Sequence, residues 1–87
     1  MRPSNILYHE LIGLEVSLLS TPNMAEYGIR GRIIYETKNA LLIRTSKGDV
    51  MIMKGKRLFL FRLPSGREVV VSGDKLIGRP EERVKRA

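Results

Sequence analysis

Cysteine is absent from this chain of 87 residues, and no apolar run approaches the length of a membrane span. Without cysteine, neither a disulfide framework nor a thiolate zinc site can form, which fits a reducing compartment. The N-terminal region also lacks the charged segment, apolar core and cleavage site of a signal peptide. We therefore expect one compact cytoplasmic domain, since 87 residues are too few for two.

Catalytic residue types are almost as scarce. The chain has one histidine, His9, whereas general acid–base catalysis needs a second titratable group close by. Its carboxylates are scattered, apart from an adjacent pair at 81–82 that suits the first turn of a helix better than a metal site. The glycine-containing segment 28–31 is too short for a phosphate-binding loop. We predict neither a catalytic site nor a metal site in this chain.

Positive charge is what the chain has in excess, with 16 Lys and Arg against 9 Asp and Glu and a net charge of +7. The excess lies in residues 28–87, whereas residues 1–27 are net negative. Clustered positive charge on a small domain indicates an anionic partner, either nucleic acid or a membrane. A membrane binder needs a basic helix with bulky apolar residues opposite, and the basic segment 80–87 offers only Val84. We therefore expect a nucleic-acid partner and no membrane partner.

Residues 28–45 predict a β-hairpin, because two β-branched runs flank the polar stretch 37–39. A three-residue loop at that stretch places Arg32 opposite Arg44 and separates apolar side chains from arginines, since side chains alternate along each strand. The predicted inward face carries Ile29, Ile33, Tyr35, Leu41 and Ile43. The predicted outward face carries Arg30, Arg32 and Arg44.

The alternative is a two-residue loop of Lys38 and Asn39, which would mix arginines with apolar residues on one face. We favour the longer loop, which also places Tyr35 opposite Leu41. Two interpretations of the outward arginines stay open. They either pair with nearby carboxylates, as surface arginines commonly do, or they contact phosphates.

The rest of the chain alternates short apolar segments with turn residues. Strands are predicted at residues 14–19, 28–36, 40–45, 49–53, 57–63 and 67–72. A short helix is predicted over 5–12 and a basic helical turn within 80–87. Five or six short strands predict an all-β fold, a small twisted antiparallel barrel with SH3-like or OB-like proportions. The single domain would comprise an N-terminal helix (1–13), the barrel (14–77) and a basic tail (78–87). The order of the strands in the sheet cannot be derived from the sequence pattern alone.

The predicted strand 57–63 carries more apolar residues than one core needs. Residues 58–61 are apolar on both faces, while a small barrel has one interior. The helix 5–12 could cover the second face, or a protein partner could bind there. A third alternative is that Phe59 and Phe61 stack on unpaired bases.

Three stretches of the sequence resemble one known family. They are residues 5–14, which read Asn-Ile-Leu-Tyr-His-Glu-Leu-Ile-Gly-Leu; the hairpin residues Gly28, Gly31, Ile33, Glu36, Thr37, Asn39, Leu41 and Ile43; and residues 78–86, which read Gly-Arg-Pro-Glu-Glu-Arg-Val-Lys-Arg. Together, and in this order, they resemble the archaeal ribonuclease P protein component 1 family, which is related to a eukaryotic subunit of ribonucleases P and MRP. The resemblance spans nearly the whole chain.

This resemblance implies an Sm-like, SH3-like barrel that serves as a non-catalytic subunit of ribonuclease P. That enzyme is an endoribonuclease whose catalyst is RNA, and it cleaves precursor tRNA to give the mature 5′ end with Mg²⁺ held by the RNA. The chain itself would bind no cofactor. Its implied partners are the ribonuclease P RNA, the zinc-ribbon protein component 4 in a heterodimer, other protein subunits and, indirectly, precursor tRNA.

Two sets of residues are the predicted sites. RNA contacts are expected from three basic clusters, namely Arg30, Arg32 and Arg44; Lys54, Lys56 and Arg57; and Arg79, Arg83, Lys85 and Arg86. Contacts with the protein partner are expected from Ile6, Leu7, Leu11 and Val84. Two other functions remain as alternatives: a ribosomal or other general RNA-binding SH3-like domain, and a barrel-type endoribonuclease of the toxin class, which would need a catalytic pair not found in the sequence.

Overall fold

The computed structural model describes residues 11–78 of the chain. Most of the predicted helix 5–12, including Ile6 and Leu7, lies outside the described residues, as does the whole basic segment from Arg79 onward. Within residues 11–78, no helix is long and apolar enough to cross a membrane.

Six strands and two short 3₁₀ helices make up the described part of the chain. The strands are β1 (Glu15–Ser20), β2 (Arg30–Glu36), β3 (Ala40–Thr45), β4 (Gly48–Met53), β5 (Leu58–Arg62) and β6 (Glu68–Ser72). The 3₁₀ helices are η2 (Met24–Glu26) and η3 (Gly73–Leu76). The strands are rich in β-branched and aromatic residues, which fit a pleated, half-buried surface. Each strand begins and ends within two residues of its predicted bounds, so the all-β prediction is confirmed.

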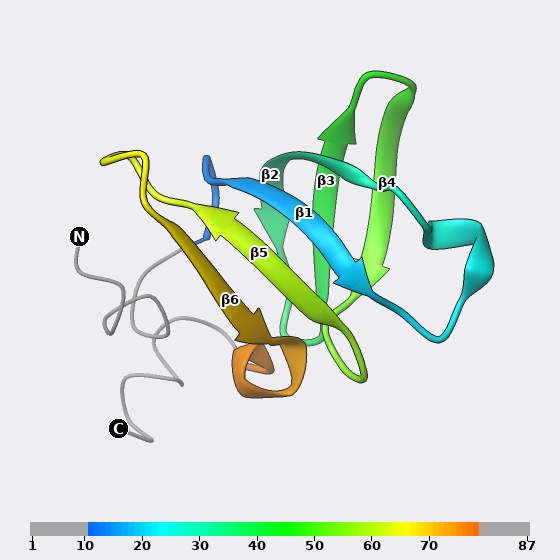
Figure 1. Ribbon diagram of the computed structural model, residues 1–87. Helices are drawn as coiled ribbons and strands as arrows, with labels where there is room; N and C mark the ends of the chain where they lie inside the picture. The colour runs from blue at the N-terminus through cyan, green and yellow to red at the C-terminus, as the bar shows by residue number, and fades with distance from the viewer. Residues whose placement is uncertain (1–10, 79–87) are drawn as a thin grey trace.

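All six strands form one antiparallel sheet in the order β4-β3-β2-β1-β5-β6. The strand order places β1 near the middle, paired with β2 on one side and with β5 on the other. Figure 1 shows how strongly the sheet twists, so that the β2–β3–β4 half and the β5–β6 half face different directions. This curl gives the sheet an inner surface that encloses the core and an outer surface that faces solvent.

At Gly31 the backbones of β2 and β3 approach one another closely. A Cβ atom at this position would lie 2.0 Å from the carbonyl oxygen of Arg44, so only glycine leaves room for the neighbouring backbone. Gly31 therefore allows the backbones of β2 and β3 to approach closely beside Arg44.

The core lies on the inner surface, and every strand contributes to it. Its buried members are Leu11, Leu14, Val16, Leu18, Ile33, Leu41, Ile43, Ile52, Phe59, Phe61, Leu63, Val71 and Leu76. Phe59 and Phe61 are fully buried, with ring centroids 6.0 Å apart, so the alternative that they stack on unpaired bases is wrong. Leu11 is fully buried as well and packs in this core, so it does not present the partner surface predicted for it.

The hairpin follows the predicted register at its open end and departs from it near the turn. Arg32 lies opposite Arg44 as predicted, but the register then shifts by one, and Tyr35 lies opposite Leu42 instead of Leu41. Ile34 is the extra residue of this β-bulge, which leaves a two-residue turn at the end of the hairpin. The predicted three-residue loop is therefore wrong, and so is the inward position of Tyr35, which is exposed.

Candidate nucleic-acid interface

Because of the bulge at Ile34, the side chain of Glu36 points inward, where it forms an ion pair with Lys54. The Lys54 Nζ donates to Glu36 Oε2 at 2.7 Å and to the carbonyl oxygens of Gly78 and Lys38 at 3.0 and 3.3 Å. Both side chains are buried, with 0% and 3% of their surface exposed. A buried charge needs such partners, because removal from water is costly. Lys54 therefore holds the ends of β2 and β4 together, and the prediction that it contacts RNA is wrong.

Arg57 is also engaged within the fold. Its Nε and Nη2 atoms donate to the two carboxylate oxygens of Glu26 at 2.7 and 3.0 Å, and only 11% of the arginine side chain is exposed. The Thr21 hydroxyl donates to the same carboxylate at 2.6 Å. The hydrogen bond from Arg57 is the main reason why the pKa of Glu26 is lowered. This pair fixes the β1–β2 loop against the start of β5, so Arg57 does not present the predicted RNA contact.

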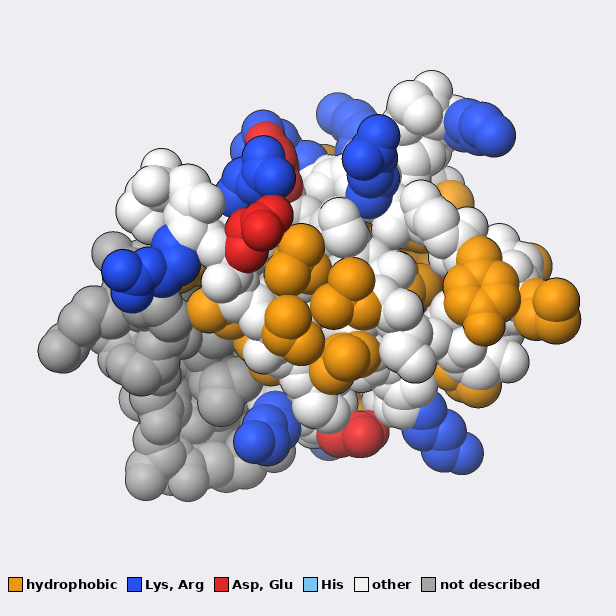
Figure 2. Space-filling model, viewed as in Figure 1, with side chains coloured by type: hydrophobic (Ala, Val, Ile, Leu, Met, Phe, Trp, Pro, Cys, Tyr) orange, Lys and Arg blue, Asp and Glu red, His pale blue; other side chains and the backbone are white. Residues whose placement is uncertain are grey.

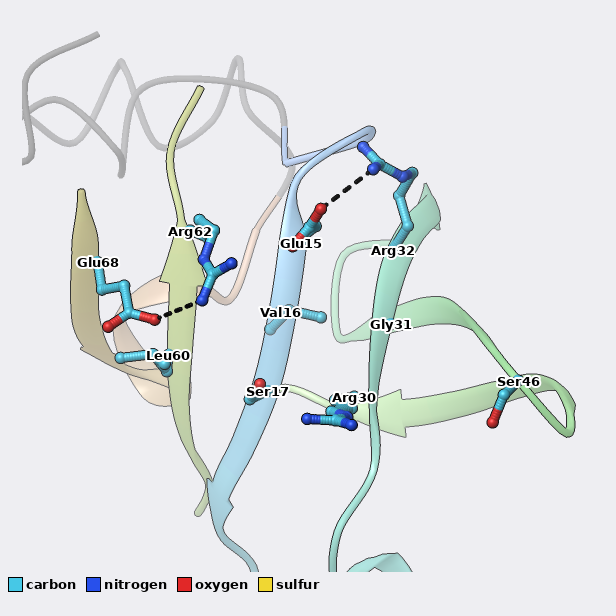
Figure 3. Close-up of a pocket in the computed structure, with 10 residues that line it drawn as sticks. All are labelled: Glu15, Val16, Ser17, Arg30, Gly31, Arg32, Ser46, Leu60, Arg62 and Glu68. Atoms are coloured by element: carbon cyan, nitrogen blue, oxygen red, sulfur yellow. Dashed lines mark hydrogen bonds and ion pairs between the residues drawn. The ribbon is translucent and has the colours of Figure 1, made fainter. Parts of the chain in front are cut away.

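Charged side chains form a single row across the outer surface of all six strands. In strand order, the cross-strand neighbours are Asp49, Arg44, Arg32, Glu15, Arg62 and Glu68. We call this set the outer ionic row. Three ion pairs lie within it: Arg44–Asp49 at 3.2 Å, Arg32–Glu15 at 3.3 Å and Arg62–Glu68 at 3.0 Å. Figure 3 shows the last two of these pairs as dashed lines.

The outer ionic row supports the carboxylate interpretation of Arg32 and Arg44. These arginines lie directly opposite one another, and each has a carboxylate on its other side, which relieves their repulsion. All six side chains are between 41% and 66% exposed, and pairs in water contribute only about 0–1 kcal/mol. The hydrogen bond from Arg62 to Glu68 raises the pKa of that arginine. Because the pairs are weak, Arg32 and Arg44 remain available to an anionic ligand.

Arg30 has a different environment from the other hairpin arginines. It lies opposite Ser17 of β1 rather than opposite a carboxylate, and it makes no ion pair with any residue in 11–78. Arg30 lines a depression of about 480 Å³ on the outer surface of β1, β2 and β5. The depression is lined by Glu15, Val16, Ser17, Arg30, Gly31, Arg32, Ser46, Leu60, Arg62 and Glu68. In Figure 3 the Arg30 guanidinium extends from β2 toward Ser17 of β1, and Ser46 lies beyond β2.

Further cations lie in the turns at the two ends of the sheet. Lys47 is exposed in the β3–β4 turn, and Lys56 is exposed between β4 and β5 with a φ of 60°. Figure 2 shows Lys and Arg side chains along the top and the bottom of this face, with a group of apolar side chains between them. The apolar group matches the outward residues of β5 and β6, where Leu60 lies opposite the exposed Val70. The face thus combines cationic edges with an apolar centre.

The predicted RNA contacts therefore fall into four groups. The side chains of Arg30 and Lys56 are exposed and make no ion pair among residues 11–78, and Arg32 and Arg44 are exposed within the outer ionic row. The third group, Lys54 and Arg57, serves the fold. The fourth group, Arg79, Arg83, Lys85 and Arg86, lies outside the described residues, as do the predicted partner contacts Ile6, Leu7 and Val84.

Sequence reasoning missed Arg62 and the two serines of the depression. Alternation along β5 places Arg62 outward once Phe61 is inward, and that signal was present in the sequence. The position of Arg62 beside Glu15 depends on the pairing of β1 with β5, which only the strand order reveals. The serines gave no signal, because isolated serines occur throughout surface strands and turns.

The described residues offer chemistry for binding anions. Guanidinium groups present several donors to phosphate oxygens, and serine hydroxyls add neutral donors. Within residues 11–78 there is no group of three or more His, Asp or Glu side chains that could hold a metal ion.

Comparison with known proteins identifies related chains. The sequence model of the family described as Ribonuclease P/MRP, subunit p29 matches residues 4–86. Ribonuclease P protein component 1 of Methanocaldococcus jannaschii is 49% identical over 85 residues, covering 97% of this chain and 88% of that protein. The protein of the same name from Staphylothermus marinus is 42% identical, covering 93% and 89%. The solved structure of Mth11, titled a homologue of human RNase P protein Rpp29, matches with a TM-score of 0.63 and 42% identity, covering 86% of this chain and 97% of that one.

Proposed function

Because the chain belongs to the ribonuclease P/MRP p29 family and is a protein subunit of ribonuclease P, we propose that its outer surface binds the RNA of that enzyme through phosphate contacts. The observation that supports this best is the placement of Arg30, Arg32 and Arg44 on one exposed face. Folded RNA is recognised largely through its shape and backbone, and cations on a rigid sheet suit that kind of recognition. Lys47 and Lys56 extend the cationic surface at the two ends of the sheet.

Binding should therefore depend strongly on salt. If six to ten phosphates are neutralised, the affinity should fall about 10³-fold or more between 50 and 200 mM salt. Filter binding of the ribonuclease P RNA over that range measures the slope. A flat response would overturn the phosphate proposal.

Reversal of Arg32 and Arg44 to Glu should weaken RNA binding and leave the circular dichroism spectrum unchanged, since both side chains are exposed.

We also propose that catalysis belongs to the RNA, which holds the required Mg²⁺, and that this chain has no catalytic site of its own. The described residues support this in one respect: their strongest ion pairs serve the fold, and their exposed polar groups suit binding. The pure protein should leave precursor tRNA intact. Addition to the ribonuclease P RNA with the other subunits should increase cleavage at the mature 5′ end. Cleavage by the protein alone would favour an endoribonuclease, and no gain on reconstitution would favour a general RNA-binding domain.

For the protein partner we propose the zinc-ribbon protein component 4. The apolar side chains on the outer surface of β1, β5 and β6 support a protein contact in general, since Leu19 and Val70 are 47% and 55% exposed. Purified component 4 and this chain should co-elute as a heterodimer in size-exclusion chromatography. Replacement of Ile6, Leu7 and Val84 by Ser should abolish co-elution if the terminal segments form the interface. Replacement of Leu19 and Val70 should do so if the outer sheet surface forms it.

A further inference from the structure

We propose that the depression around Arg30 binds one phosphodiester group of the RNA backbone, with the Arg30 guanidinium and the Ser17 hydroxyl as its donors. The inference rests on the proposed function, because it names a single site within the RNA-binding surface. The depression has a volume of about 480 Å³, which falls in the range of ligand sites in proteins.

The lining of the depression is electrostatically asymmetric. At one end, Arg32 pairs with Glu15 and Arg62 pairs with Glu68, so that end carries no net charge. At the other end, Arg30 lies opposite Ser17 and has no carboxylate partner among residues 11–78. A phosphate that enters the depression is therefore attracted to the Arg30 end, away from the two carboxylates.

The backbone at Arg30 is also held in place before any ligand binds. It begins β2 and lies in register with β1, and the amide of Leu18 donates to the carbonyl oxygen of Ile29 at 3.0 Å. These contacts fix the backbone from which the guanidinium extends toward Ser17 of β1 (Figure 3). A donor fixed on paired strands loses less conformational entropy on binding than one on a mobile loop. The outer ionic row next to it then forms a neutral wall along one side of the bound backbone.

The principal test uses Arg30→Gln in the full chain, with Arg67→Gln as the matched control. Arg67 is exposed in the β5–β6 turn and does not line the depression, so both variants lose one arginine charge. Filter binding to the ribonuclease P RNA should show a loss of about tenfold for Arg30→Gln, as expected for charge-assisted hydrogen bonds. The slope of log affinity against log salt should fall by about one. Arg67→Gln should lose less than about threefold, which is the change expected for a cation away from the site.

Two milder variants separate the donor geometry from the charge. Arg30→Lys keeps the charge, so it should keep the salt slope and still lose affinity, because lysine has no planar fork of donors. Ser17→Ala should lose about threefold at an unchanged slope, since a neutral hydrogen bond is removed. Circular dichroism and the midpoint of thermal unfolding check that each variant folds.

Inorganic phosphate provides an independent probe. At constant ionic strength, replacement of chloride by phosphate should displace RNA from the wild-type chain more than from Arg30→Gln. Equal losses for Arg30→Gln and Arg67→Gln, together with equal displacement by phosphate, would overturn the Arg30 site while general RNA binding survives. Failure of the wild-type chain to bind RNA in a salt-dependent way would instead overturn the proposed function.

Discussion

Two ion pairs of this domain use the same chemistry in opposite environments. Lys54 and Glu36 pair inside the sheet with 0% and 3% of their side chains exposed, whereas Arg44 and Asp49 pair on the outside with 66% and 41% exposed. The inner pair has been removed from water, so each partner depends on the other. The outer pair keeps its water, so either partner can leave at little cost. Position, more than residue type, therefore separates cations that maintain the fold from cations available to RNA.

The largest effect is expected from Lys54→Met, which breaks the inner pair. The substitution leaves the Glu36 carboxylate buried without its lysine, so the free energy of unfolding should fall by about 3–5 kcal/mol. Urea denaturation followed by circular dichroism measures it. Lys56→Met, two residues along on the exposed surface, is the control and should change stability by less than about 0.5 kcal/mol.

A second variant keeps this prediction testable if Lys54→Met does not fold. Glu36→Gln added to Lys54→Met removes the isolated charge, so the double variant should recover part of the lost stability. If Lys54→Met and Lys56→Met were equally stable, the inner pair would not maintain the fold.

A smaller loss of stability is expected for Glu26→Gln, which weakens the largely buried ion pair between Glu26 and Arg57. Hydrogen bonds to charged groups contribute about 1.5–3 kcal/mol, so the free energy of unfolding should fall by up to this amount near pH 7. The pKa of Glu26 is lowered in the folded state, so its contribution is present above the ordinary pKa of 4.5 and is lost as the pH falls through the folded value. Stability curves from pH 7 to pH 2 should decline less steeply for Glu26→Gln than for the wild type. Parallel curves would show that Glu26 does not contribute to the acid dependence.

Changes in the outer ionic row should affect RNA more than stability. Asp49→Asn releases Arg44 from its carboxylate and removes one negative charge from the surface. The free energy of unfolding should change by less than about 1 kcal/mol, whereas RNA affinity at low salt should rise severalfold. Denaturation and filter binding of the same preparation measure both quantities. Asp74→Asn, on η3 and away from the row, controls for the change in net charge. A large loss of stability in Asp49→Asn would mean that the outer ionic row maintains the fold, as the buried ion pairs do.

The smallest effect is expected at Tyr35, the neighbour of Glu36 on the other side of the strand. Tyr35→Ser removes an exposed ring that lies opposite Leu42, so stability should fall by less than about 1 kcal/mol. Thermal unfolding measures the shift. A loss of about 3 kcal/mol or more would mean that Tyr35 lies in the core, as the unbulged register predicts.

The sequence predicted the strands, the antiparallel hairpin and the pairing of Arg32 with Arg44, because these depend on local alternation and turn residues. It did not predict the bulge at Ile34. The bulge places Glu36 inward, and the ion pair with Lys54, which directly follows β4, makes that position favourable. No local pattern reveals a partner 18 residues away, so the loop length and the position of Tyr35 were both predicted wrongly.

The same limit applies to the candidate site. Arg30, Arg32 and Arg44 were placed on the outer surface by alternation alone, which was correct. Lys54 and Arg57 look like surface cations in the sequence, and their burial depends on carboxylates contributed by distant segments. The outer ionic row crosses all six strands, and Glu15 of β1 lies beside Arg62 of β5 within it. Local sequence pattern does not predict that β1 pairs with β5, so it does not predict this part of the row.

The position of β1 near the middle of the sheet also has a consequence for the order of folding. The strands β2, β3 and β4 are consecutive in the chain and pair with one another, and β5 pairs with β6. These two units can form from local contacts, whereas Val16 of β1 must find Phe61 of β5 across most of the domain. Closing so long a loop carries an entropic penalty before any contact compensates for it. We therefore expect the docking of β1 against β5 to be the slow step of folding, and a nascent chain to join the two parts of its sheet only after β5 has emerged from the ribosome.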